Sequence, residues 1–593
     1  MIIDVLTELI LNAVNAAHLA GEFPLEEMPT AVKLEKPADK AHGDYSSNIA
    51  LILKKSTGLK DSRDIASRII KHLPTDGSVI DRIEVAGPGF MNLYLKPDWL
   101  HNILLRIWAE DANYGMATNR IGDRVLIEFV SANPTGPISV VNGRAAALGD
   151  VLGNLLASQG AVVEREFYIN DALNSLQLEK FAASVALRYL QELGHPLSVP
   201  SSNPEEADIL EPGGADVVLQ PQLSFPKDGY RGEYVRDIAR AIIAEVGNRF
   251  AYPLALEPES MAYFREATLK SMVAAQREAL QAFGLQYNNW FYESSLYESG
   301  SVDKTIRHLR DREMAYEQEG ALWLRSSAFG DEKDRVLVRS NEKATYVAAD
   351  AAYHDNKFSR GFNHLINIWG ADHHGYVARL KAGVAALGYD VSRLEIVLTQ
   401  MVSLVRDGEA VIGGKRKGNV IELQQDLVDE VGKDAARFYF LLNSYETPAT
   451  VDVELARRQS MDNPVYYVQY AHARLCSILA KAETAGFALK SPADVNLSVL
   501  THPAELEVLR KLADYPAEIK IAADTYSPHR LTRYARDMAS LLNVFYENCR
   551  VLSGKEEEVP AEITIARISL ADGARRVLRN LLTMLGVSAP EKM

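Results

Sequence analysis

The chain has 593 residues, of which 47% are hydrophobic and 24% are charged, and its formal net charge is −15. This length exceeds what one hydrophobic core fills, so we expect about three domains. The composition is that of an ordinary globular protein and excludes a fibrous or disordered chain. The negative charge argues against indiscriminate nucleic-acid binding, although a local basic surface remains compatible with it.

The first residues and the cysteines bear on location. Residues 1–23 are amphipathic, contain Asp4 and Glu8 and lack a basic leader, which predicts a first helix and not a signal peptide. No run of eighteen apolar residues occurs in the sequence, so we expect no membrane span. Cys476 and Cys549 are too few and too scattered for a disulfide framework or a zinc site. We therefore expect a cytoplasmic protein without bound metal.

Residues 1 to about 115 predict a small α+β domain. Two helical stretches flank a charged loop that contains the segment HGDYSSN, residues 42–48, and a strand-like segment follows near residue 90. Charged loops are typical of solvated surface. The alternative is a nucleic-acid contact, in which the cations grip phosphate while Tyr45 and Asn48 contact a base.

Residues 116 to about 430 have α/β character. The apolar, β-branched run 125–130 predicts a buried parallel strand, and an Ala/Leu-rich helix is expected over 143–156 after a turn rich in Pro and Gly. Ligands of parallel sheets bind beyond the carboxyl ends of such strands, where a helix N-terminus offers N–H groups to phosphate. By itself this pattern is weak evidence for a nucleotide site, because many such turns carry Gly and Pro and bind nothing. A mainly helical insertion is expected at about 181–300, and HLINIWGAD, residues 364–372, predicts a later strand.

Residues 431–593 predict a helical domain in which aromatic and basic residues are mixed. Tyr467, Tyr470 and Arg474 are candidate RNA contacts. The alternative is an aromatic stripe that packs in the core.

Four segments together resemble the bacterial arginyl-tRNA synthetases, which are class I aminoacyl-tRNA synthetases. These are SANPTGP at 131–137, NIWGADHHGYVARLKA at 367–382, DNPVYYVQYAHAR at 462–474 and LGVSAP at 585–590. The resemblance covers essentially the whole chain. It implies a multidomain α/β protein: an N-terminal α+β domain that binds the tRNA elbow (1–115), a class I Rossmann-type catalytic domain with an insertion (116–430) and a C-terminal α-helical bundle that reads the anticodon (431–593).

The same resemblance implies a function. Arginine is activated by ATP to arginyl-adenylate and is then transferred to the 3′ end of tRNA(Arg). The implied partners are tRNA(Arg), L-arginine and ATP with Mg²⁺ as its counter-ion, and the implied state is a monomer. Such chemistry needs no protein nucleophile, because the enzyme supplies positioning and charge stabilisation.

An arginine pocket requires carboxylates, since guanidinium is a rigid fork that pairs with them bidentately. Glu128 lies inside an apolar strand, where an ionised carboxylate is costly unless it is paired. Asp350 follows Tyr346 by one helical turn. The alternatives are a structural ion pair for Glu128 and a solvated helix face for Asp350. The resemblance favours Glu128 and Asp350 on the guanidinium, Tyr346 beside it, and Ser131 and Asn133 near the amino and carboxylate end.

The ATP site follows from the same resemblance, which implies adenosine contacts at Gly370, Asp372 and His373. Tandem histidines suggest a metal site, but no third ligand follows at useful spacing, so we expect none. Further ATP contacts are expected at Pro134, Thr135, Gly136, Pro137, Ser139, Asn142 and Gly143.

Two signature motifs of the family are altered. The His-x-Gly-His element is replaced by Ser139, Val140, Val141 and Asn142, so neither histidine is present. Ser139 and Asn142 remain the candidate catalytic groups because both donate hydrogen bonds, although neither carries charge. Loss of one donor at a developing charge costs about a hundred- to a thousandfold in rate.

The Lys-Met-Ser-Lys loop aligns with residues 412–415, where the first lysine is missing and Lys415 is kept. Lys415, the third candidate catalytic group, and Arg416 are expected to contact the triphosphate. A solvated basic loop is the alternative. A third departure is the segment 340–343, where an Asp-Gly-Thr run is expected.

These departures leave open three functions. The first is a working synthetase with altered phosphate contacts. The second is a paralogue that binds arginine or tRNA without normal charging. The third is a nucleotidyltransferase that does not use tRNA, against which the aromatic and basic C-terminal residues argue.

Overall fold

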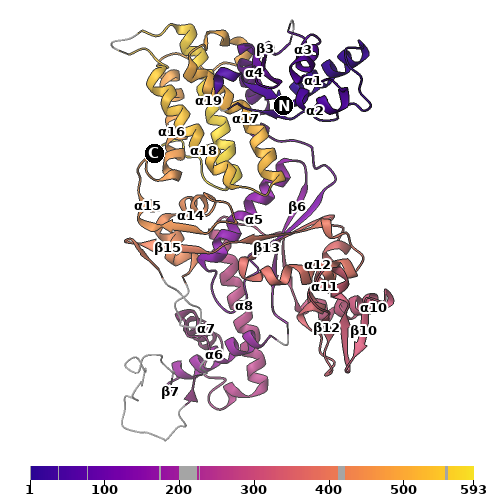
Figure 1. Ribbon diagram of the computed structural model, residues 1–593. Helices are drawn as coiled ribbons and strands as arrows, with labels where there is room; N and C mark the ends of the chain where they lie inside the picture. The colour runs from indigo at the N-terminus through magenta and orange to yellow at the C-terminus, as the bar shows by residue number, and fades with distance from the viewer. Residues whose placement is uncertain are drawn as a thin grey trace.

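The computed structural model describes residues 2–37, 39–75, 78–172, 175–198, 223–225, 228–411, 421–554 and 558–593, and Figure 1 shows their arrangement. Two expectations fall outside these ranges. One is the basic loop with Lys415 and Arg416, and the other is the part of the expected insertion at residues 199–222 and 226–227.

The centre of the molecule is a five-stranded parallel sheet in the order β14-β13-β5-β6-β9. The strands are β5 (Arg124–Phe129), β6 (Val162–Ile169), β9 (Asn289–Tyr292), β13 (His364–Gly370) and β14 (Leu394–Thr399). From β5 the chain builds outward to β9 on one side and then returns to β13 on the other. The strand order therefore reverses between β5 and β13, and the carboxyl ends at that point are where doubly wound sheets bind ligands. The predicted Rossmann-type fold is confirmed.

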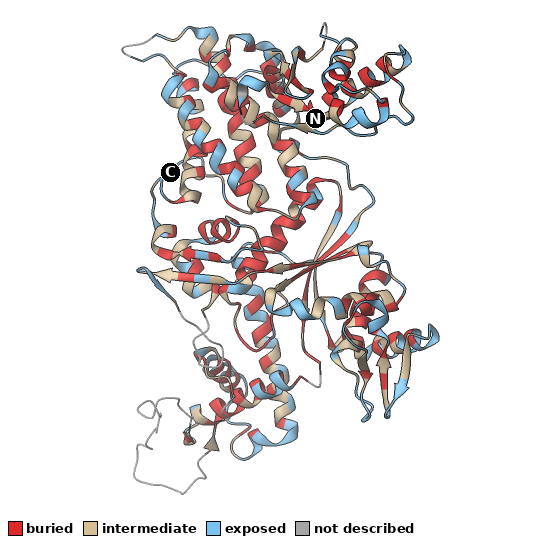
Figure 2. Cartoon of the chain, viewed as in Figure 1, coloured by how far each residue is buried: buried red, intermediate tan, exposed pale blue. Residues whose placement is uncertain are grey.

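Helix α5 (Val140–Ser158) follows the first turn, and its residues are buried on nearly every side. Gly149 permits this close packing, because a Cβ atom there would lie 2.3 Å from Cγ of Phe129. The helix runs from the sheet toward the C-terminal bundle (Figure 1). Buried side chains of α5 and of the bundle belong to one continuous core, which Figure 2 shows as red faces on both.

The N-terminal residues form a separate α+β unit with its own core. An antiparallel sheet of order β1-β2-β4-β3 packs with three helices. The elements are α1 (Ile2–Leu19), β1 (Leu34–Glu35), β2 (Tyr45–Ser47), α2 (Ile49–Thr57), α3 (Ser62–Ile70), β3 (Ile80–Ala86) and β4 (Phe90–Leu95). Among the described helices, α1 is long and apolar enough to cross a membrane by length and composition alone. Its residues Leu6, Ile10 and Val14 are fully buried in the core of this unit.

Helix α4 (Pro97–Glu110) lies inside the expected range of the N-terminal domain but packs elsewhere. Its buried residues Leu100, Leu104 and Ile107 belong to the large core that includes the C-terminal bundle. The apolar face of α4 is therefore covered by the bundle and not by the N-terminal sheet. We place the structural boundary at Lys96, between β4 and α4.

The insertion is a helical unit with its own core, made by α6 (Leu176–Glu192), α7 (Glu233–Val246) and α8 (Pro258–Ala282). The chain returns to the central sheet at β9, earlier than residue 300. A second small unit holds an antiparallel sheet, β10-β11-β12, beside α11 (Tyr346–Ser359). Its other elements are α9 (Ser294–Glu298), α10 (Ser301–Asp311), β10 (Ala315–Gln318), β11 (Ala321–Leu324) and β12 (Arg335–Val338).

The C-terminal part begins with a short mixed sheet and not with helix alone. Strand β17 (Ala449–Asp452) pairs in parallel with β15 (Val402–Arg406), which also pairs with β16 (Glu409–Ala410). Helix α12 (Val377–Ala386) packs with α11 beside the central sheet. The helices of the C-terminal part are α13 (Asp429–Val431), α14 (Lys433–Phe440), α15 (Val453–Arg457), α16 (Pro464–Thr484), α17 (Pro503–Asp524), α18 (His529–Asn548) and α19 (Ala561–Leu585). The last four form the expected bundle (Figure 1).

Candidate active site

A cavity of about 770 Å³ opens where the strand order reverses, beyond the carboxyl ends of β5, β6, β13 and β14. All five residues predicted to bind arginine line it, although they come from segments more than 200 residues apart. Four residues predicted to bind ATP line the same cavity. The predicted lining residues are Glu128, Ser131, Asn133, Asn142, Tyr346, Asp350, Gly370, Asp372 and His373.

The turn after β5 is strained. Val130 has φ of 70° and Ser131 has φ of 39°, both in the left-handed region that β-branched residues in particular avoid. The Ser131 hydroxyl donates to Oε1 of Glu128 at 3.0 Å and accepts from the backbone N–H of Tyr168 at 3.1 Å. These contacts hold the turn in an unfavourable conformation at the cavity wall, as is common at ligand sites.

Glu128 is paired with an internal cation. Lys357, whose side chain is fully buried, donates from Nζ to Oε2 of Glu128 at 2.6 Å and to Oδ1 of Asn367 at 3.1 Å. With Ser131 on the other oxygen, both carboxylate oxygens have partners inside the protein. The geometry thus agrees with the structural ion pair given above as the alternative for Glu128, and it removes the reason for expecting direct contact with guanidinium.

Asp350 lies on α11 and faces the cavity. The Tyr376 hydroxyl donates to its Oδ2 atom. Burial raises the pKa of Asp350 to about 6, against the lowering effect of that hydrogen bond. Tyr346, one turn earlier, also lines the cavity and is 58% exposed. Asp350 therefore places a buried carboxyl at the cavity whose negative charge its neighbours stabilise poorly.

His354 fixes α11 against β13. Its Nδ1–H donates to the backbone oxygen of Asp350 at 2.8 Å, and its Nε2 accepts from Nδ2 of Asn367 at 2.9 Å. Burial and the nearby Lys357 charge hold the pKa of His354 well below its usual range, so the ring is neutral and can accept this bond. A neutral ring also adds no positive charge beside Asp350.

Glu293 is a residue that the sequence did not single out. It directly follows β9 and is only 2% exposed. Burial and then the charge of Asp350 raise its pKa to about 7, and the Tyr168 hydroxyl is hydrogen-bonded to it. The sequence contained a signal for Glu293, since this acid directly follows the aromatic run Trp290–Tyr292. Such a position predicts the inward-facing end of a strand. Asp350 and Glu293 are thus two neighbouring acids, both destabilised by burial.

The altered motif at the start of α5 builds a helix cap. Oγ of Ser139 accepts from the backbone N–H of Asn142 at 3.4 Å and donates to Oδ1 of Asn142 at 2.7 Å, while that oxygen also accepts from the N–H of Ser139 at 3.2 Å. This is a capping box. Because Val141, Asn142 and Ala145 line the cavity, the positive end of the α5 dipole reaches its wall.

The proline-rich turn lies behind the cavity wall. Pro134, Thr135 and Gly136 are buried, and Gln276 of α8 donates to the backbone oxygen of Gly136 at 2.8 Å. The expected ATP contacts at residues 134–137, Ser139 and Gly143 do not line the cavity. The reason is that α8 covers the turn, while Leu423 packs against Gly143, where a Cβ atom would lie 2.5 Å from Cδ1.

Two arginines that the sequence did not single out also line the cavity. Arg335 is held by Asp331 through a bidentate pair at 2.8 and 2.7 Å. Arg379 lies over the ring of Tyr376, at 4.8 Å from its centroid. The cavity therefore keeps fixed cations even though both histidines of the first signature are missing.

Comparison with known proteins assigns this architecture. Residues 4–95 match the arginyl tRNA synthetase N terminal domain, 241–452 match the catalytic domain of tRNA synthetases class I (R), and 468–593 match the DALR anticodon binding domain. The chain is 44% identical to the arginine–tRNA ligase of Carboxydothermus hydrogenoformans, over 98% of this chain and 97% of that protein. The chain belongs to the arginine–tRNA ligase family. The resemblance noted in the sequence is confirmed.

A second relative, the arginine–tRNA ligase of Moorella thermoacetica, is also 44% identical over 98% of this chain and 97% of that protein. The solved arginyl-tRNA synthetase of Thermus thermophilus shares the fold, with a TM-score of 0.69, 20% identity and full coverage of both chains. The matched catalytic segment begins at residue 241, so it does not include the altered motif at Ser139 and Asn142.

The residues predicted to bind tRNA differ in their surroundings. Tyr45 is 4% exposed, belongs to the N-terminal core and lines a cavity beside Lys36, so its burial argues against stacking on a base. Asn48 is the N-cap residue of α2. On α16, Tyr470 stacks on Tyr466 with centroids 6.2 Å apart, and Arg474 lies 4.1 Å from the ring centroid of Tyr546.

The third residue on α16, Tyr467, accepts from Nδ2 of Asn543 at 2.9 Å. Like Tyr470 and Arg474 it is half-buried, so each of the three keeps a surface within the matched or adjoining part of the anticodon binding domain. This partial exposure shows that the three side chains are not fully buried in a core stripe, and their contact with RNA stays a prediction.

Proposed function

We propose that the protein is an arginine–tRNA ligase. It joins the carboxylate of L-arginine to the α-phosphate of ATP, releases pyrophosphate, and transfers the arginyl group to the 3′ end of tRNA(Arg) with release of AMP. The observation that carries the proposal is the buried acid Asp350 in the cavity at the switch point of the sheet, with a second buried acid, Glu293, at the end of β9, in a chain of this family. We expect it to work in the cytoplasm as a monomer.

The guanidinium of the substrate supplies the cation that these acids lack. Lys357 is already engaged by Glu128, so it does not neutralise Asp350 fully, as the raised pKa of Asp350 indicates. A guanidinium fork offers several fixed donors to carboxylates, whereas a lysine ammonium does not match that geometry. Tyr346 extends the wall beside Asp350, while Ser131 and Asn133 are suited to the amino and carboxylate end.

The remaining groups serve positioning and charge. The capped N-terminus of α5, with Ser139 and Asn142, directs its positive dipole at the phosphates. Lys415 and Arg416 neutralise the triphosphate together with Mg²⁺, which acts as the nucleotide's counter-ion. Gly370 at the end of β13, with Asp372 and His373 just after it, holds the adenosine. No side chain acts as a nucleophile in this scheme.

The paralogue without normal charging remains the second candidate, because the two motif histidines are absent. The working enzyme is favoured by the helix cap at those positions and by the fixed cations Arg335 and Arg379 in the cavity. Both observations give the phosphates and the developing charge an alternative to imidazole.

A charging assay tests the proposal. The protein is incubated with labelled arginine, ATP and total tRNA, and acid-precipitable label is compared with a reaction lacking enzyme. We expect label with arginine and none with lysine. Absence of label, combined with arginine binding in calorimetry, would establish the paralogue instead. Absence of both label and arginine binding would reject the arginine site altogether.

A further inference from the structure

The joint between the N-terminal unit and the bundle is loosely packed. One residue, Lys96, separates β4 of the N-terminal sheet from α4 of the bundle core. Among the described residues, Trp99 is the single partly buried apolar side chain that packs against both cores. Trp99 also lines two cavities at the joint, of about 270 and 240 Å³. Apolar packing alone therefore gives the joint little resistance to rotation.

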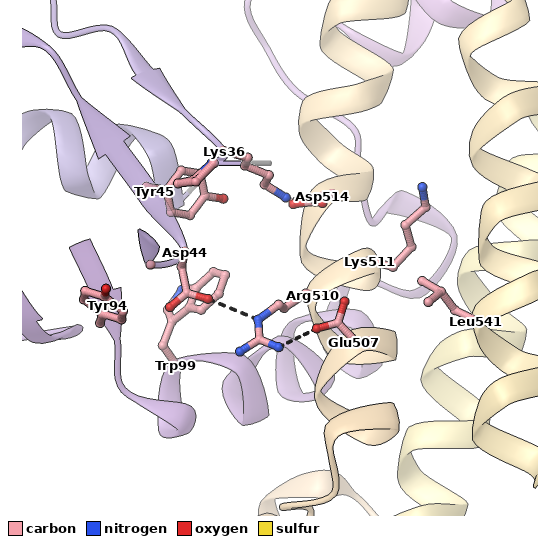
Figure 3. A pocket seen from close by; sticks show the side chains of 12 residues that line it. Lys36, Asp44, Tyr45, Tyr94, Trp99, Glu507, Arg510, Lys511, Asp514 and Leu541 are labelled. Atoms are coloured by element: carbon pink, nitrogen blue, oxygen red, sulfur yellow. Dashed lines mark hydrogen bonds and ion pairs between the residues drawn. The ribbon is translucent and has the colours of Figure 1, made fainter. Parts of the chain in front are cut away.

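Polar contacts cross the joint at the larger cavity (Figure 3). Arg510 of α17 donates from Nε to Oδ1 of Asp44 at 3.1 Å, and Glu507 on the same helix accepts from its Nη1 at 2.7 Å. A second pair joins Lys36 to Asp514 of α17. Asp44 and Arg510 are partly buried, so solvent screens their pair less than a surface pair, whereas the Lys36 side chain of the second pair is 47% exposed.

Asp44 connects the ion pair with Arg510 to the joint at Lys96. Its Oδ2 atom accepts from the backbone N–H of Leu95 at 2.9 Å, next to Lys96. Gly43 presses the same loop onto β4, since it has φ of +90° and a Cβ atom there would lie 2.7 Å from the backbone oxygen of Leu93. The HGDYSSN segment is therefore built into the joint, which explains why Tyr45 is buried.

We propose that Asp44–Arg510 and Lys36–Asp514 form a latch that sets the angle of the N-terminal unit against the bundle, and that Asp44 and Arg510 are positioning residues for tRNA. The inference rests on the proposed function. A long RNA that contacts both units binds tightly only when the two surfaces are held at the right spacing, because the second contact is then intramolecular. Opening the latch lowers the effective concentration of the second RNA-binding surface, and it leaves the arginine and ATP sites unchanged.

The latch and simple electrostatics predict opposite effects on RNA binding when the negative charge of Asp44 is removed. Removing a negative charge strengthens RNA binding if only net charge matters. If the latch acts as proposed, Asp44→Asn weakens tRNA binding, as Arg510→Ala does. We expect each variant to raise the KM for tRNA(Arg) about tenfold, while the KM values for arginine and ATP and the kcat at saturating tRNA stay within twofold.

Control variants separate the latch from loss of charge or of fold. Lys520→Ala removes a cation whose ion pair with Asp524 lies within α17, and should leave the KM for tRNA unchanged. Arg510→Lys should restore part of the affinity. An RNA made of the anticodon stem–loop alone should bind wild type and Arg510→Ala equally. An unchanged KM for tRNA in both Asp44→Asn and Arg510→Ala, or an equal loss for the stem–loop, would overturn the latch.

A readout without activity distinguishes failure of the latch from failure of the proposed function. Spin labels at Ile52→Cys on α2 and Val544→Cys on α18, both at exposed positions, report the distance between the two units in a Cys476→Ala background. Arg510→Ala should broaden this distance distribution, and Lys520→Ala should not. Identical distributions would overturn the latch even if the enzyme charges tRNA.

Discussion

The Nζ atom of Lys357 lies 2.6 Å from Oε2 of Glu128, and the two residues are 229 positions apart in the sequence. This pair joins α11 to the central strand β5 directly below the cavity. It engages Glu128, one of the two acids that the sequence had suggested for the substrate guanidinium. The acids near this pair whose pKa values burial raises are Asp350, which lines the cavity, and Glu293, to which the Tyr168 hydroxyl is hydrogen-bonded.

Breaking this pair should be strongly destabilising. Lys357→Met leaves the Glu128 carboxylate buried without its cation, which costs about 3–5 kcal/mol for buried pairs in general. We expect a clearly lower thermal unfolding temperature than for Lys54→Met, which changes an exposed lysine of α2. The double variant Glu128→Gln/Lys357→Met should recover part of the loss. Equal melting of the Lys357 variant and wild type would show that the pair contributes nothing.

Asp350→Asn should abolish arginine recognition while the fold persists. The variant removes the carboxylate proposed to pair with guanidinium, and we expect the KM for arginine to rise at least about a hundredfold, since a charge-assisted bidentate pair is lost. Asp355→Asn on the same helix is the matched control, because Asp355 is bonded by Tyr389 and Thr305 and does not line the cavity. Calorimetry showing normal arginine affinity for Asp350→Asn would remove Asp350 from the pocket.

Arginine affinity should depend on pH between about 5 and 8. The pKa values of Asp350 and Glu293 are raised to about 6 and about 7, so the acids become ionised, and able to pair with guanidinium, as the pH rises through this window. The KM for arginine should therefore fall with rising pH and level off above it. Glu293→Gln should flatten the upper part of this profile and raise the KM at pH 8. A pH-independent KM in the wild type would contradict the role of both acids.

The Glu293→Gln variant should also be more stable toward unfolding than wild type at pH 8. A carboxyl with a raised pKa adds stability that is full below its ordinary pKa of 4.5 and is lost as the pH rises through about 7. Glu293→Gln removes that loss, so the free energy of unfolding should increase by on the order of 1–2 kcal/mol at pH 8 and by little at pH 5. Thermal melts at both pH values check the sign, and a lower melting temperature at pH 8 would refute it.

Lys415→Ala should slow formation of arginyl-adenylate more than it weakens arginine binding. The residue is the retained lysine of the altered second motif, and a cation there stabilises charge on the leaving pyrophosphate. We expect a rate loss of about a hundredfold in single-turnover adenylation, with arginine affinity unchanged. An unaffected adenylation rate would leave the loop with the solvated role given as its alternative.

The local pattern of the chain was enough to predict several elements. The β-branched run at 125–130 became β5, and the Ala/Leu periodicity became α5. The strand at 364–372 became β13. These predictions succeed because side-chain periodicity and turn residues act over a few positions, and a buried parallel strand needs a continuous apolar run.

The sequence by itself determined the family, the doubly wound centre and several of the residues that meet at one cavity, among them Asp350 and Tyr346. Only the tertiary structure decided which of the acids is already neutralised, that Glu293 lies beside Asp350, that α4 belongs with the bundle and that Tyr45 is buried at a joint. The physical reason is the distance along the chain over which each kind of interaction acts. Helices and strands follow from neighbours in sequence, whereas the charge state and exposure of a side chain depend on groups hundreds of residues away that packing brings within a few ångströms.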